Sequence, residues 1–86
     1  MNINELIAIV KNKLEKKITI QYLKIEDKSF LHKNHKGNQK DKFHLKLTIK
    51  SEELAKLSKI SSNRKVYSVL EYELKEYIHS IQILLN

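Results

Sequence analysis

The clearest pattern in this chain of 86 residues is a strict alternation of apolar and polar side chains over residues 43–50. The apolar positions are Phe43, Leu45, Leu47 and Ile49, and the polar ones are His44, Lys46, Thr48 and Lys50. Because successive side chains of a strand point to opposite faces, the pattern predicts a strand with one face in the core and the other in water. A chain this short buries only about 60 to 65% of the surface that its unfolded form exposes. We therefore expect one domain, residues 1–86, with one thin core.

The residues before this strand predict a helix, a strand and a loop. Asn2 and Glu5 resemble a capping box, and apolar residues then recur at helical spacing as far as Leu14, which predicts an amphipathic helix. Residues 18–27 are rich in branched side chains and predict a strand, with a bend or a late start because the apolar phase shifts midway. Residues 30–42 are polar and aperiodic, contain the only glycine, and predict a loop.

The residues after it predict two helices and a last strand. Ser51 is a good N-cap for a short helix, and Ser61 and Ser62 can cap a third. The apolar stripes of these helices are Leu54, Leu57 and Ile60, then Val66, Leu70, Leu74 and Tyr77. Alternating apolar residues predict a strand that ends at Leu85, with His79 in the same phase at its opening. The order α-β-β-α-α-β is that of an α+β, class II KH-like fold, with a three-stranded sheet packed against helices.

The composition excludes several kinds of chemistry. The chain contains no cysteine, so it has no disulfide, thiol nucleophile or sulfur ligand of its own. No activated nucleophile or phosphate-binding glycine loop is evident, and Glu71, Glu73 and Glu76 fall along one helix as expected for a solvated face. No apolar run approaches the roughly 20 residues of a membrane span, and no cleavable leader is recognisable. We expect a soluble, unprocessed protein that is not an enzyme.

The formal net charge of +7 is unevenly distributed. Residues 28–65 hold eleven basic and three acidic side chains, a balance of +8, and the rest of the chain has a balance of −1. A basic middle favours an acidic partner, either nucleic acid or an acidic protein surface. The simpler alternative is a solvated lysine face, because sixteen of the seventeen basic residues are lysine.

Short motifs occur along this order of elements. They are Asp27, Ser29 and His32 after the first strand, His44 with Leu45, Ser51 after the second strand, Arg64, Val66, Tyr67 and Leu70 in the third helix, and His79 at the last strand. In their order and spacing, over roughly residues 18–85, they resemble the BolA-like family. Asn63 stands where the family usually has histidine, and residues 30–42 lack the cysteine that some members carry, so the chain resembles the histidine-loop type.

The resemblance implies a non-enzymatic, cytoplasmic regulator of redox and stress responses. Family members bind monothiol glutaredoxins and share or transfer a [2Fe-2S] cluster, and glutaredoxin and glutathione supply the thiolates. The resemblance implies His79 as the principal ligand from this chain and His35 as the second, with His32 or Asp41 as alternatives. His32 and His44 would orient the loop and the strand by hydrogen bonds. We expect a monomer in isolation and a heterodimer with the partner. The simpler interpretation of His79 is a hydrogen-bonded structural residue.

The second hypothesis is DNA binding. Some family members are described as transcriptional regulators, and the second and third helices can be interpreted as a helix-turn-helix pair. The candidate contact residues cluster near their junction and are Lys56, Lys59, Asn63, Arg64 and Lys65. Lysines can hold phosphates, and Asn63 or Arg64 could reach a base edge. KH-type RNA binding is not expected, because residues 58–63 contain no glycine for the GxxG clamp. Val66, Tyr67 and Leu70 are expected in the core.

Overall fold

The alternating residues form β2 (Phe43–Lys50), the central strand of a three-stranded sheet. β1 (Tyr22–Asp27) pairs with it in antiparallel orientation, and β3 (Ile78–Leu85) pairs with it in parallel. The structure is a computed structural model that describes residues 1–29 and 42–86. β1 begins later than residue 18, so the late start is the correct explanation of the phase shift in the sequence.

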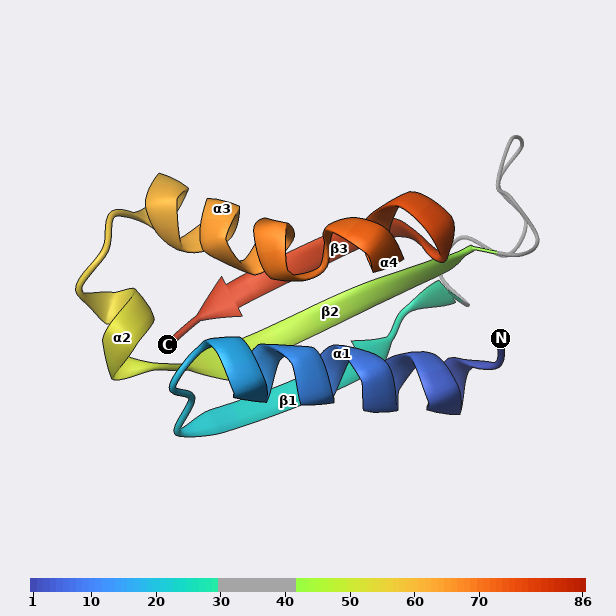
Figure 1. The fold of residues 1–86 in the computed structure, drawn as a ribbon, viewed down its shortest axis with the longest axis horizontal. Coiled ribbons are helices and arrows are strands. Elements are labelled where there is room, and N and C mark those ends of the chain that lie inside the picture. The colour runs from blue at the N-terminus through green and yellow to red at the C-terminus, as the bar shows by residue number, and fades with distance from the viewer. Residues whose placement is uncertain (30–41) are drawn as a thin grey trace.

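The helices pack against one face of this sheet (Figure 1). They are α1 (Ile3–Lys17), α2 (Glu52–Ala55), α3 (Lys59–Val69) and α4 (Glu71–Glu76). The core lies between the two layers, where Leu45, Leu47 and Ile49 of β2 are almost completely buried. The predicted α+β, class II KH-like fold is confirmed. Within the described ranges, no helix is both long and apolar enough to cross a membrane.

Local side-chain chemistry starts α1 where the sequence predicts it. The Oδ1 of Asn2 accepts a hydrogen bond of 2.8 Å from the backbone N–H of Glu5, which is the N-cap bond. Leu6, Val10 and Leu14 recur on one face and are fully buried. The helix continues one turn beyond Leu14, and the lysines of this last turn favour its negative end.

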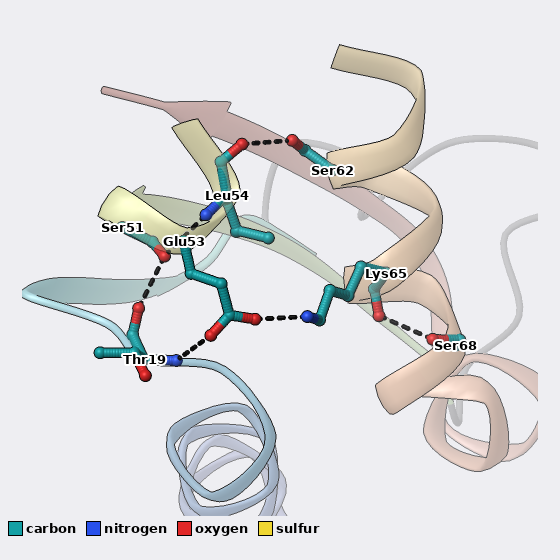
Figure 2. Close-up of polar contacts among 7 residues, drawn as sticks. All are labelled: Thr19, Ser51, Glu53, Leu54, Ser62, Lys65 and Ser68. Carbon is teal, nitrogen blue, oxygen red and sulfur yellow. Dashed lines mark hydrogen bonds and ion pairs between the residues drawn. The ribbon is translucent and has the colours of Figure 1, made fainter. Parts of the chain in front are cut away.

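A set of polar contacts joins the ends of α1, β2 and α3 (Figure 2). The Oγ of Ser51 accepts from the N–H of Leu54 as the cap of α2 and donates to the carbonyl of Thr19 at 2.6 Å. The Oε1 of Glu53 accepts from the N–H of Thr19 at 3.0 Å, and its Oε2 pairs with the ammonium of Lys65. Lys65 and the Thr19 amide together hold the pKa of Glu53 below its ordinary value.

The junction of α2 and α3 differs from the prediction. The cap of α3 is Ser58, whose Oγ accepts from the N–H of Ser61, so the predicted start at Ser61 and Ser62 is wrong. Ser62 is instead buried inside α3 and donates to the carbonyl of Leu54 at 2.8 Å. Because α2 ends at residue 55, Leu57 and Ile60 do not extend its apolar stripe and are exposed.

The predicted third helix is divided in two at Leu70. The φ of −101° and ψ of 16° of this residue lie outside the α-helical range, so the helix axis changes direction there. Val66 and Leu70 are fully buried as predicted, but Tyr67 is exposed and not in the core. The prediction that Glu71, Glu73 and Glu76 form a solvated face is wrong for Glu73, which is buried and paired with Lys13.

Candidate functional site at the opening of β3

A β-bulge determines where His79 lies. Phe43 pairs with Ile78 and His44 pairs with Ser80, so His79 is one extra residue on β3. Ile78 and Ile81 both pack on the core, and the two residues between them are exposed. The prediction that His79 shares the inward phase of the later apolar residues is therefore wrong, because the bulge resets the alternation. It turns the imidazole away from the core.

The ring of His44 lies next to the ring of His79. The centroids of the two rings are 5.0 Å apart, with an angle of 58° between their planes. The Nδ1 of His44 shares a hydrogen bond of 2.6 Å with the Oγ of Ser80. Although His44 occupies the polar phase of β2, it is only 5% exposed, so the predicted solvated position is wrong. A buried and an exposed imidazole thus stand side by side.

Hydrogen bonds from the end of β1 hold this part of β2. The Oδ1 of Asp27 accepts from the N–H of Ser29 at 2.9 Å, and the Oγ of Ser29 accepts from the N–H of His44 at 3.0 Å. The carbonyl of His44 accepts from the N–H of Lys28 at 2.7 Å. Lys28 and Ser29 therefore lie beside the backbone of His44. The predicted second ligand, His35, and its alternatives His32 and Asp41 lie outside the described residues.

Two tyrosines lie at the other side of the opening. Tyr72 and Tyr77 make an edge-to-face contact with ring centroids 6.0 Å apart. The hydrogen bond between them, with the nearby charges of Glu76 and Glu73, raises the pKa of Tyr77 above its ordinary value. The carbonyl of Tyr77 accepts from the N–H of Phe43, which aligns the two strands where the bulge begins.

The described residues at this opening offer one exposed imidazole. A neutral imidazole binds a metal ion through a ring nitrogen, and His79 presents its ring outward. Across residues 1–29 and 42–86, no three His, Asp or Glu side chains come close enough to hold a metal ion together. Any metal or cluster bound at His79 therefore needs further ligands from residues 30–41 or from a partner.

The predicted DNA-binding residues lie near the other end of β3, around the α2–α3 junction (Figure 1). Lys56, Lys59 and Arg64 are exposed. Lys65 is paired with Glu53, and the amide oxygen of Asn63 is buried. Three of the five predicted residues are therefore exposed charges that make no ion pair among the described residues. All five lie at the α2–α3 end of the molecule and not at the opening of β3.

Comparison with known proteins identifies the family. Residues 14–86 match the family model described as BolA-like protein. This chain belongs to the BolA-like family. The resemblance inferred from its motifs is thereby confirmed.

Individual BolA relatives agree with this assignment. The chain is 29% identical over 75 residues to the DNA-binding transcriptional regulator BolA of Haemophilus influenzae, covering 87% of this chain and 70% of that protein. BolA1 from Arabidopsis thaliana has a similar structure, with a TM-score of 0.78, 29% identity, and coverage of 92% of this chain and 87% of that one. The BolA domain of SufE1 from Arabidopsis thaliana also has a TM-score of 0.78, with 28% identity over 100% of this chain and 93% of that one.

The BolA motif residues divide into two groups in this structure. Asp27, Ser29 and Ser51 make the backbone hydrogen bonds described above, and Val66 and Leu70 fill the core. Among the described residues, the exposed members outside this first group are Arg64, Tyr67 and His79. Packing explains the first group, so the second group is where binding is to be sought.

Sequence reasoning missed Ser80 and the buried position of His44. The hydrogen bond between these two side chains depends on the bulge, which offsets β3 by one residue against β2. No glycine or proline marks the bulge in the sequence. Only the pairing of strands far apart in the chain reveals it.

Proposed function

We propose that this BolA-like chain is a non-enzymatic cytoplasmic regulator that binds a monothiol glutaredoxin and shares or transfers a [2Fe-2S] cluster. His79 is the principal ligand that this chain contributes to one iron, and His35 is the second. The observation that carries the proposal is the exposed imidazole of His79, which a bulge turns outward at the opening of β3. Bulges next to functional sites commonly redirect a side chain in this way.

The partner follows from the ligands that a cluster needs. A [2Fe-2S] cluster takes four protein or cofactor ligands, most of them thiolates, and this chain has no cysteine. Thiolates of glutaredoxin and glutathione complete the set. Histidine on one iron raises the reduction potential and can be protonated near neutral pH, which favours release of the cluster to an acceptor.

The test is an anaerobic titration of cluster-loaded monothiol glutaredoxin, with glutathione, by this chain, followed by visible circular dichroism. We expect a new spectrum that saturates near equimolar protein and is absent with His79→Ala. Gln82→Ala is the matched control, because it removes another exposed polar side chain from β3. A spectrum that never changes, or that is the same with His79→Ala, contradicts the proposal.

DNA binding is the second candidate, favoured by the exposed charges of Lys56, Lys59 and Arg64 and by the similarity to the DNA-binding transcriptional regulator BolA of Haemophilus influenzae. Contacts with phosphates release counterions, so the logarithm of the affinity for a duplex should fall by about 0.9 per contact for each tenfold rise in salt concentration. Replacing Lys59 and Arg64 with glutamine should lower that slope, whereas Lys16→Gln on α1 should not. A slope that the first two changes leave intact contradicts this function.

A further inference from the structure

A cavity lies at the far end of β3 from His79. It has a volume of about 450 Å³, is open to solvent on one side, and is lined by the α2–α3 junction and the last residues of the strand. Its apolar wall includes Leu54, Leu57, Ile83 and Leu84. His79 and Leu85 are six positions apart along β3, a distance of about 20 Å at about 3.3 Å per residue. The cavity is therefore a separate place on the molecule.

Asn63 brings an unpaired acceptor to this cavity. Its Oδ1 is buried and has no hydrogen-bond partner among the described residues. The adjacent hydroxyl of Ser62 donates to the carbonyl of Leu54 and is not available to it. Buried polar atoms in native proteins are nearly always paired, so this acceptor would gain from a donor on an occupant once the side chain of Asn63 turns toward the cavity. This acceptor is on the residue that departs from the usual family histidine.

The rim of the cavity is apolar and basic. Leu57 and Leu84 line it while remaining 41% and 45% exposed, and Ile60, on the first turn of α3, is 66% exposed. Lys59 also lines it, and Lys56 precedes Leu57 on the surface. No acidic side chain is among the described residues that line the cavity. An exposed apolar patch with a basic rim is typical of a protein-binding surface for an acidic partner.

We propose that this cavity binds a short acidic segment of a partner protein. One apolar side chain of the segment enters the cavity, the side chain of Asn63 turns so that its Oδ1 accepts from a backbone N–H, and flanking carboxylates contact Lys56 and Lys59. DNA fits this surface less well, because phosphates have no N–H to donate and leave the apolar wall unfilled. A second copy of this chain is also disfavoured, because both copies carry a net charge of +7.

The test begins with selection of binders to the full chain from a random peptide library displayed on phage. We expect enriched peptides with aspartate or glutamate on either side of one large apolar residue. A synthetic peptide of the selected sequence should shift the amide resonances of Leu57, Asn63 and Leu84 in a ¹⁵N-labelled sample. Enrichment of peptides without acidic residues, or shifts confined to other parts of the chain, overturns the proposal.

Matched variants separate the site from general charge. Lys59→Glu and Leu84→Ser should each weaken peptide binding at least about tenfold, the effect of losing a central contact. Lys16→Glu makes the same charge change on α1, and Tyr22→Ser removes a similarly exposed apolar side chain from β1, so both should bind normally. Equal weakening by the controls overturns the proposal.

Two further measurements exclude the other occupants and keep this proposal distinct from the proposed function. If duplex DNA but not the peptide shifts the three resonances, or if sedimentation shows a dimer that Leu84→Ser dissociates, the acidic segment is not the occupant. Peptide binding is measured without glutaredoxin or cluster, and His79→Ala should leave it unchanged. A failed cluster titration therefore leaves this result intact, and the reverse also holds.

Discussion

The buried pair of Glu73 and Lys13 makes an asymmetric prediction about stability. Glu73 is 4% exposed, its Oε2 accepts from the Lys13 ammonium at 2.6 Å, and its Oε1 is buried without a hydrogen-bond partner among residues 1–29 and 42–86. The side chain of Lys13 is 42% exposed and also lies over the ring of Tyr72. Burial thus desolvates the carboxylate of Glu73 more than the ammonium of Lys13. Among the described residues, only one of the two carboxylate oxygens is hydrogen-bonded. Removing the lysine and removing the glutamate should have very different effects.

The magnitudes follow from burial. Loss of one partner from a fully buried pair costs about 3 to 5 kcal/mol, because the other charge is left uncompensated. Water reaches the half-exposed lysine, so we expect Lys13→Met to lower the free energy of unfolding by about 1 to 3 kcal/mol. Glu73→Met removes both the desolvated charge and the unpaired oxygen. It should leave the free energy of unfolding within about 1 kcal/mol of wild type or raise it.

Urea unfolding at neutral pH, followed by far-ultraviolet circular dichroism, measures both changes. Lys11→Met is the control, because Lys11 is an exposed lysine of the same helix that makes no ion pair among the described residues. The double variant should behave like Glu73→Met alone. If Glu73→Met destabilises the fold as much as Lys13→Met does, the pair itself stabilises the protein and the argument from desolvation is refuted.

The remaining predictions concern the polar contacts around α2 and α3. Because Lys65 and the Thr19 amide lower the pKa of Glu53 below 4.5, its ionised form contributes stability that is fully present above about pH 4.5. That contribution disappears as the pH falls through the lowered folded-state pKa, so Glu53→Gln should reduce the loss of stability on acidification, measured by urea unfolding at neutral and acidic pH. Ser58→Ala should cost about 1 kcal/mol as the lost cap of α3, and Ser61→Ala should cost almost nothing, measured by thermal unfolding. Equal costs would show that Ser58 is not the cap of α3.

Much of the fold can be predicted from the sequence because local signals and burial agree. The strand over residues 43–50 has the predicted bounds, and Asn2 and Ser51 cap the helices that follow them. The errors occur where local signals are ambiguous. Ser58, Ser61 and Ser62 are all possible caps by residue type, and only the packing of α3 against the end of α2 selects the first.

The candidate site divides in the same way. The sequence identifies His79 through its motif and its place at the opening of a strand, and the family comparison confirms the context of that motif. The outward direction of the ring and the His44 neighbour depend on a register offset between two strands. Residues in β2 and β3 pair across a long segment of chain, so no local pattern carries that information.

By itself, the sequence determined the order of elements apart from the division of the third helix, the strand at the centre of the sheet and the family, because these depend on periodicity and on motif spacing within short segments. The tertiary structure alone decided which polar side chains are buried, exposed or paired. Glu73 meets Lys13 across sixty positions of the chain, and Asn63 meets the end of β3 at a cavity. Such contacts form only when the helices close over one face of the sheet, because burial and hydrogen bonding are properties of the packed layers.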